Sequence, residues 1–589
     1  MSNGKWNLDN LYQGYSDSEE LQHFVRDLHN DIEKQINRLM NKEEKANKSL
    51  FFFYLNTMED LKKRLEELVE FTLCLVSQNT KDEKAQQLDA RASEISTRHS
   101  FMEMLFQNFL IEIHDVDFLE LEKELNDDRI SLYLHHLREN AKDRLPVEME
   151  NLISELAIDG YKGWAELYQL SISNLRFQFQ EEQLTLGELS KYSKDNNRII
   201  REEVHHTRQN TLRENEETFA AILNHFAGFR MKVYKQRGWD SVLKEPLILN
   251  KISQHTLNTM WDTIKSNNHI FHSYFKHKAK LLGIDKLSYF DLFVPIDQKN
   301  DGQKQYSLEE GIQFILEKTK KQFPIFSKFV EKSYQNQWID SEIRVDKQLG
   351  GFAAAFPVSR ESRVFLNYYG SFNDVAVLAH ELGHTFHGTV LFDQPSLLQK
   401  YPMSLAETAS TLSELIITDS ENVSSKEEEL EVLEEQINAA VLYLLYVQFH
   451  FFFEIEFYRL KAEGLNPTAA ELTKMVVEKQ REVFGDQLEH YQDYFWIVTP
   501  HFYYVEEPFY NFVYTFGFLF SNGLYEQSKS YGDDFESKYI ELLKDTGILS
   551  VEELSMKHFD IDLTKPDFWQ QAINRIESNI QRYMELTES

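Results

Sequence analysis

The sequence predicts a mostly α-helical protein with one small β-sheet near the active site, and three observations support this fold class. Glycine (21 residues) and proline (11 residues) are scarce in a chain of 589, so few positions interrupt a helix. Apolar residues recur at helical spacing in segments such as 61–75 and 430–445. Strand-like runs are few, and residues 364–368 form the clearest one.

Residues 380–384, His-Glu-Leu-Gly-His, are the most informative motif. In a helix, His380 and His384 lie one turn apart on the same face, which is the spacing that grips one Zn²⁺. Glu381 lies beside them, where it can act as a base on a water that the metal activates. The alternative is a surface helix with two solvated histidines. The apolar residues around the motif instead predict a largely buried helix, with Asn373 or Asp374 as its N-cap.

A catalytic zinc site needs a third protein ligand and one open position. Two familiar zinc-peptidase spacings fail in this chain. His387 and Val390 stand where one pattern requires Gly and His, and no acid lies about nineteen residues after His384, where the other pattern requires it. His387 itself is about 10 Å along the helix from His380, too far for both to bind one ion. We therefore expect His387 to support a ligand or to contact substrate.

The next acid in the chain is Glu407, in a second predicted helix over residues 404–414. Glu414 follows seven residues later and shares its face. Ser404 and Glu407 also match a capping box, in which the glutamate bonds back to the N-cap amide. Spacing alone therefore leaves two alternatives for Glu407, a metal ligand or a helix cap.

Residues 364–375, which lead directly into the motif at 380–387, resemble the oligoendopeptidase F branch of the thimet-oligopeptidase-like M3 metallopeptidases. That family places its third ligand in a Glu-x-x-Ser motif, which Glu407 and Ser410 match. The resemblance thus implies one Zn²⁺ per chain, held by His380, His384 and Glu407. Glu414 matches a second acid of the same helix, which implies a role in orienting a ligand histidine.

The resemblance spans essentially the whole chain, and it is strongest between residues 340 and 415. Further matching segments are residues 6–12, 289–295, 347–352 and 566–569. Gly351 is a departure, because the family more often has alanine at this position.

Residues 501–514 resemble the family's His, Pro-Phe-Tyr and Tyr segment. The resemblance implies that His501 and Tyr514 hold the substrate and the developing oxyanion, with Tyr510 beside them. The alternative is an aromatic wall of the core, since the chain has 28 tyrosines and most tyrosines in such a stretch are amphipathic packing residues.

The predicted function is a zinc endopeptidase that hydrolyses internal bonds of short, unstructured peptides, which the family resemblance implies enter a deep channel. An edge strand of the small sheet is expected to pair with the peptide backbone. Two alternatives remain open: a zinc carboxypeptidase of similar helical fold, and a peptide-binding relative without catalysis.

We expect an N-terminal helical domain over residues 1–193 and a catalytic domain over 194–589, divided at a polar break. The net charge of −33 argues against nucleic acid as a partner. The apolar run 439–453 is too short for a membrane span, the N-terminus lacks an apolar signal region, and the single Cys74 is expected to be a core thiol. These features favour the cytoplasm, and they leave the oligomeric state open.

Overall fold

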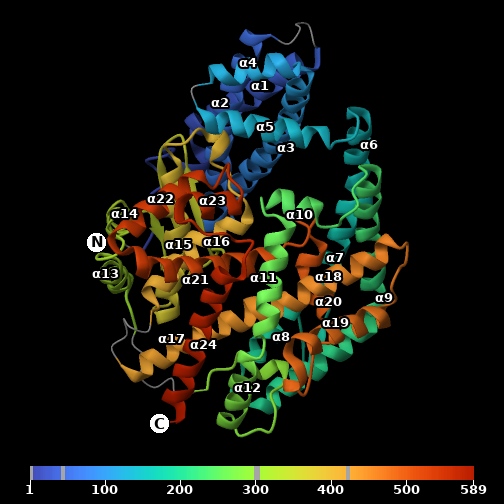
Figure 1. Ribbon diagram of the computed structural model, residues 1–589, viewed down its shortest axis with the longest axis vertical. Helices are drawn as coiled ribbons and strands as arrows, with labels where there is room; N and C mark the ends of the chain where they lie inside the picture. Colours follow the sequence, from blue (N-terminus) through green and yellow to red (C-terminus); the bar gives the residue numbers. More distant parts are fainter. Residues whose placement is uncertain (1–3, 42–46, 126, 297–304, 420–424, 589) are drawn as a thin grey trace. The chain divides into compact units, whose positions relative to one another are not determined.

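The computed structural model describes residues 4–41, 47–125, 127–296, 305–419 and 425–588. The chain forms two compact units, and each unit is assembled from three separate segments. Unit 1 comprises Met1–Arg144, Gln303–Thr418 and Gln527–Asp560, and unit 2 comprises Leu145–Gly302, Asp419–Glu526 and Ile561–Ser589. Helices dominate both units (Figure 1), which confirms the predicted mostly α fold class. The single boundary expected after residue 193 stays a prediction.

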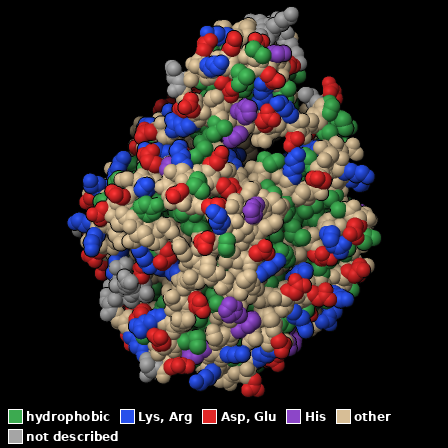
Figure 2. Space-filling model, viewed as in Figure 1, with side chains coloured by type: hydrophobic (Ala, Val, Ile, Leu, Met, Phe, Trp, Pro, Cys, Tyr) green, Lys and Arg blue, Asp and Glu red, His purple; other side chains and the backbone are tan. Residues whose placement is uncertain are grey.

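Unit 1 begins with long helices and ends with two short ones. Its helices are α1 (Glu19–Asn41), α2 (Lys48–Gln78), α3 (Glu83–Glu112), α4 (Asp115–Glu124), α5 (Asp128–Lys142), α13 (Leu308–Thr319), α14 (Pro324–Gln335), α15 (Phe372–Leu391), α16 (Met403–Ile417), α22 (Phe535–Asp545) and α23 (Val551–Phe559). Asn47 and Asp82 cap α2 and α3, because their side chains accept the first free backbone N–H groups of each helix. Acidic and basic side chains are interspersed over α1 to α5 (Figure 2).

A three-stranded sheet lies in the middle of unit 1. Its strands are β3 (Ile339–Asp340), β4 (Gly351–Phe356) and β5 (Glu361–Leu366), in the order β3-β5-β4. β3 is parallel to β5, and β4 pairs with β5 in antiparallel register from Gly351 opposite Leu366 to Phe356 opposite Glu361. Phe356 and Phe365 extend into the apolar core that α1, α2 and α3 build. The predicted strand at 364–368 therefore exists, but it begins and ends earlier than expected.

Both β4 and β5 pack against α15, the helix that carries the His-Glu-Leu-Gly-His motif, so the sheet lies where the sequence predicts it. On β4, one face turns towards the core and the other towards α15. A Cβ atom at Gly388 would lie 2.9 Å from Ala355 Cβ, which shows how closely strand and helix approach. Because the order is β3-β5-β4, β4 is an edge strand of this sheet among the described residues, as is the two-residue strand β3.

Unit 2 is also helical, and α9 is its longest element. Its helices are α6 (Val147–Ala157), α7 (Gly163–Asn174), α8 (Leu186–Lys191), α9 (Arg198–Gln236), α10 (Lys244–Leu249), α11 (Gln254–Asn267), α12 (Ile270–Leu281), α17 (Lys426–Ala440), α18 (Val447–Ala462), α19 (Ala469–Phe484), α20 (Phe495–Val498), α24 (Pro566–Glu588) and most of α21 (Phe512–Tyr531). Strands β1 (Phe177–Phe179) and β2 (Glu182–Leu184) form a small antiparallel hairpin.

One helical run in unit 2, Lys426–Ala462, has the length and apolar composition that a membrane span requires. It contains the apolar segment singled out in the sequence. However, 72% of its most apolar window is buried within the protein, as expected for a core helix.

Candidate active site

Helix α15 presents the first three predicted site residues, and its start is fixed by a capping box. The Ser371 hydroxyl accepts the N–H of Asp374 at 3.1 Å, and the Asp374 carboxylate accepts the N–H of Ser371 at 2.9 Å. The N-cap is thus Ser371, and the prediction of Asn373 or Asp374 was wrong because Asp374 is the far partner of the box. The expectation of a largely buried helix is confirmed.

His380, His384 and Glu407 lie close together, although Glu407 comes from a different helix, α16. Glu407 Oε2 is 3.4 Å from His380 Nε2 and 3.6 Å from His384 Nε2. A tetrahedral ion with ligand bonds of about 2.0–2.1 Å separates its donor atoms by about 3.3 Å. Two imidazole nitrogens and one carboxylate oxygen are also a donor set that catalytic zinc uses. The three residues therefore fit a metal ion, and no other such cluster occurs among the described residues.

Two neighbours orient these side chains. Glu414 Oε2 lies 3.3 Å from His380 Nδ1, the nitrogen that faces away from Glu407. A carboxylate on this second nitrogen fixes the tautomer and the ring orientation of a metal-binding histidine. Ser410 donates its hydroxyl to Glu407 Oε2 at 3.0 Å, so both residues of the Glu-x-x-Ser motif belong to the site.

The competing cap assignment for Glu407 is not found in the structure. Helix α16 begins at Met403, and its N-cap is Pro402, which makes no side-chain cap hydrogen bond. Ser404 is therefore already inside the helix and cannot serve as the N-cap of a capping box. The Glu407 carboxylate instead points towards the two imidazoles.

The charges around the imidazoles are set by burial and by the carboxylates. Burial opposes the charged form of His380, but its ion pair with Glu414, with Glu407 also nearby, raises the pKa of His380 to about 9. Burial and the neighbouring His380 lower the pKa of His384 to about 4. The site thus concentrates negative charge from two glutamates beside two nitrogen donors, an arrangement suited to a cation.

Glu381 is only 7% exposed and lies against the first residue of the edge strand. A Cβ atom at Gly351 would lie 2.8 Å from Glu381 Oε1, so a side chain at residue 351 would force this carboxylate to shift. Burial, together with Glu407 and Glu414, raises the pKa of Glu381 to about 7, against the opposing effect of His380. A carboxylate with such a pKa can both take and return a proton near neutral pH.

Gly383 explains how α16 comes close enough to place Glu407 beside the histidines. A Cβ atom at this position would lie 2.6 Å from the carbonyl oxygen of Ala409 and 2.8 Å from Ser410 Cα. Both contacts involve backbone atoms, which cannot rotate away. The glycine inside the motif therefore permits the helix-to-helix approach on which the three-residue cluster depends.

Replacing Gly383 by alanine is expected to push α16 away from α15, to destabilise the protein by about 1–3 kcal/mol, and to weaken metal binding. Thermal unfolding and the zinc content after dialysis measure the two effects. Gly187→Ala is the matched control, because Gly187 lies in α8 with no atom near the added methyl. A Gly383→Ala protein that retained wild-type zinc content would contradict this role.

His387 lies in the core. It is fully buried, its ring stacks on Tyr401 with centroids 4.0 Å apart, and its Nε2 lies 2.9 Å from Thr546 Oγ1. Burial, with a further effect of His384, lowers its pKa to about 3. A fully buried neutral histidine cannot touch a substrate, so the substrate contact considered for His387 is wrong. It supports the inner face of α15.

His501, Tyr510 and Tyr514 gather in unit 2, where the structure adds Tyr504 to them. The ring of His501 lies 5.2 Å from Tyr510, 5.2 Å from Tyr504 and 6.0 Å from Tyr514, between centroids. All four side chains are partly exposed. Tyr503, in contrast, is buried and stacks on Tyr168 with centroids 3.6 Å apart, so it belongs to the core.

Two residues that the sequence did not reveal hold this aromatic cluster. The Asn511 side-chain oxygen lies 2.5 Å from His501 Nδ1, which leaves Nε2 as the accessible nitrogen. Arg230 of α9 donates to the Tyr504 carbonyl at 2.7 Å and to the Tyr458 hydroxyl at 2.7 Å. Burial lowers the pKa of His501. Arg230 acts through contacts distant in sequence, whereas Asn511 lies within the matching segment 501–514, at a position to which the resemblance assigns no role.

Comparison with known proteins identifies the family of this chain. A family model for peptidase family M3 matches residues 191–575, and one for oligopeptidase F matches residues 110–177. The group B oligopeptidase PepB of Streptococcus agalactiae is 24% identical over 88% of this chain and 87% of its own length. Oligopeptidase PepF of Bacillus subtilis is 22% identical over 90% of this chain and 80% of its own.

A crystal structure of oligoendopeptidase F from Enterococcus faecium has a TM-score of 0.70 at 18% identity, covering 96% of this chain and 99% of that one. At this identity the structural likeness speaks for the fold alone. The family match is independent of it and extends over the segment that carries the His-His-Glu cluster. The chain is therefore a peptidase of family M3, in its oligoendopeptidase F branch.

Proposed function

We propose that this protein is a zinc-dependent endopeptidase that cleaves internal bonds of short, unstructured peptides. The observation that carries the proposal is the cluster of His380, His384 and Glu407, whose donor atoms lie within 4.8 Å of one another, with the buried Glu381 beside it. The family, whose members are metallopeptidases, supports peptide hydrolysis in general. The metal, the base and the position of the cut are our proposal.

His380, His384 and Glu407 would hold the zinc ion. When bound, zinc supplies Lewis-acid activation of a water molecule and of the scissile carbonyl. Glu414 binds the Nδ1 side of His380 and so orients its Nε2 towards Glu407, and Ser410 holds the Glu407 carboxylate by its Oε2. These two partners fix the ligands before any ion arrives.

Glu381 is the proposed general base. Its carboxylate takes the proton of the attacking water and later delivers it to the leaving amine, as a base that becomes an acid. Glu381 is buried where α15 meets Gly351, and this desolvation brings its pKa to about 7. A pKa near neutrality favours both the uptake and the release of the proton. Gly351 gives the carboxylate space without opening it to bulk solvent.

His501 and Tyr514 are the proposed donors to the oxyanion that forms at the scissile carbonyl, with Tyr510 beside them. The family resemblance assigns these roles, and the shared cluster of the three side chains supports it. One well-placed donor of this kind contributes about 3 kcal/mol to transition-state stabilisation. Asn511 fixes which nitrogen of His501 is exposed, since it binds the other.

Edge strand β4 is the proposed support for the substrate backbone. Among the described residues, β5 is the only strand that pairs with β4, so its other edge can bind an extended peptide by strand addition. This mode requires an unstructured segment, in agreement with the names of the relatives, which are oligopeptidases. We propose that peptides are the partners and that they bind in a deep channel. The proposed location of the protein is the cytoplasm.

Incubating the metal-loaded protein with a mixed peptide pool, with and without a chelator, tests the proposal. We expect internal cuts that the chelator abolishes and that added Zn²⁺ restores. Mass spectrometry of the products distinguishes the alternatives. Stepwise loss of C-terminal residues would indicate a carboxypeptidase, whereas peptide binding without cleavage at full zinc content would indicate a non-catalytic relative.

A further inference from the structure

Leu349 is an exposed leucine in a loop that is otherwise tightly held. The loop, residues 341–350, joins β3 to β4, and Leu349 is 79% exposed. A single exposed apolar side chain is common on protein surfaces and needs no explanation. What distinguishes Leu349 is the restraint on the backbone around it and its distance from the proposed base.

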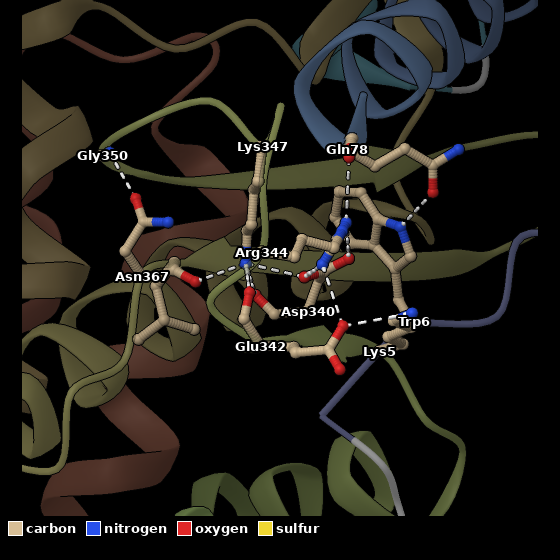
Figure 3. A network of polar contacts seen from close by, with 10 residues as sticks. Lys5, Trp6, Gln78, Asp340, Glu342, Arg344, Lys347, Gly350 and Asn367 are labelled. Atoms are coloured by element: carbon tan, nitrogen blue, oxygen red, sulfur yellow. Dashed lines mark hydrogen bonds and ion pairs between the residues drawn. The ribbon is translucent and has the colours of Figure 1, made fainter. Parts of the chain in front are cut away.

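The restraint begins with Lys347, whose side chain is fully buried and whose polar contacts are drawn in Figure 3. It donates to Asp340 Oδ1 at 2.7 Å and to the carbonyl oxygens of Asp340, Glu342 and Leu366 at 3.1, 3.1 and 2.8 Å. Asp340 also binds Arg344 through both carboxylate oxygens, at 2.7 and 2.8 Å. A buried ion pair is tolerated only when its groups are fully partnered. Lys347 thereby ties the loop to the ends of β3 and β5.

The residues on both sides of Leu349 are fixed as well. The Gln348 N–H donates to the Ser77 carbonyl at 2.9 Å. The Gly350 N–H donates to Asn367 Oδ1 at 2.9 Å (Figure 3). Gly350 has a φ of +109°, which suits glycine alone at this turn. Leu349 is thus an exposed apolar side chain on a preorganised backbone. A ligand that covers it therefore loses little free energy to ordering of the loop.

The position of Leu349 relates it to the proposed base. Gly351, two residues further on, begins β4 and touches Glu381. Two peptide units span at most about 7.6 Å between Cα atoms, so Leu349 lies within that distance of Gly351. A peptide paired with the edge of β4 advances about 3.3 Å per residue. A substrate side chain within about three residues of the scissile bond can therefore reach Leu349.

We propose that Leu349 is a specificity-determining residue, the apolar subsite that receives one large apolar side chain of the substrate on one side of the scissile bond. This inference rests on the proposed endopeptidase function and on strand addition at β4. The side chain it takes is leucine, phenylalanine or one of similar size, because covering a fixed leucine with apolar surface removes both from water. A charged or small side chain gains nothing there.

Leu349→Ser tests the subsite. Peptide series that vary one position at a time, within three residues of the cut, are compared for kcat/KM. We expect the variant to lose about tenfold for peptides with leucine or phenylalanine at one position, the range for partial loss of an apolar contact. It should cleave the alanine peptide at that position as fast as wild type does. Leu349 is exposed, so the substitution leaves folding intact.

Val345→Ser is the matched control. Val345 lies in the same loop and is 84% exposed. Its neighbour Asp346 is held next to α2 rather than at the start of β4, because the Asp346 carbonyl oxygen accepts the N–H of Thr80, just beyond the end of α2. Its serine variant should keep the wild-type profile at every position. An unchanged profile in Leu349→Ser, with wild type active, overturns the subsite alone. A loss that is equal for all peptides also overturns it. If wild type shows no chelator-sensitive cleavage, the proposed function falls, and the subsite falls with it.

Discussion

Replacing Glu381 by glutamine is expected to lower kcat for a peptide substrate by about a thousandfold, within the range for a lost general base, while the zinc content stays at one ion per chain. Glutamine has nearly the volume of glutamate, so the contact with Gly351 and the packing of α15 are preserved. Its amide cannot accept and return a proton. The reaction then retains its metal ligands and loses the group that moves the proton.

Zinc per chain and single-turnover rates on one quenched peptide are the two measurements for this variant. Glu120→Gln provides the control, because Glu120 is an exposed glutamate of the same unit on α4, and its replacement should change neither quantity. Substantial turnover in fully metallated Glu381→Gln protein would refute the assignment of Glu381 as the base. A parallel loss of zinc would show instead that Glu381 helps to hold the ion.

Replacing Glu407 by alanine is expected to weaken zinc binding by more than about 100-fold, since loss of even a supporting partner weakens binding by about 10- to 100-fold. The substitution removes the oxygen donor and leaves only the two imidazoles, which are too few for a stable catalytic site. Activity at limiting zinc should disappear accordingly.

Glu414→Gln is the matched comparison on the same helix, because Glu414 binds His380 at the nitrogen that faces away from Glu407. Titration with a zinc buffer should show a smaller loss of affinity than for Glu407→Ala, within the range for a supporting partner. If Glu414→Gln loses more affinity than Glu407→Ala, the ligand assignment of the two glutamates must be exchanged. Circular dichroism establishes that both variants remain folded.

The sequence predicts the parts of this site that depend on local geometry. The two histidines and Glu381 follow from one helix and one spacing, and the buried face of α15 follows from its apolar pattern. Glu407 was less certain, because a capping box explained it equally well. Only the observed start of α16 at Met403 removes that alternative, and helix ends are the boundaries that sequence patterns locate least well.

Contacts between residues far apart in sequence could not be predicted. The approach of α16 to α15 depends on the space that Gly383 leaves. The conformation of the loop that precedes Gly351 depends on the contacts of Lys347 with the ends of two strands. Arg230 shapes the His501 cluster from a helix outside any motif, and Asn511 does so from within segment 501–514, at a position for which the sequence predicts no role. The assembly of each unit from three segments likewise has no local signal, since no linker composition marks the points where the chain leaves one unit for the other.

That assembly has a consequence for synthesis on the ribosome. Unit 1 needs its last segment, Gln527–Asp560, and Thr546 in that segment is the partner of His387 on the inner face of α15. Until this segment has been translated, the helix that carries two of the proposed zinc ligands lacks part of its cover. Nascent chains should therefore complete the proposed metal site only after Gln527–Asp560 has emerged, so a premature stop codon before these residues is expected to yield an inactive product.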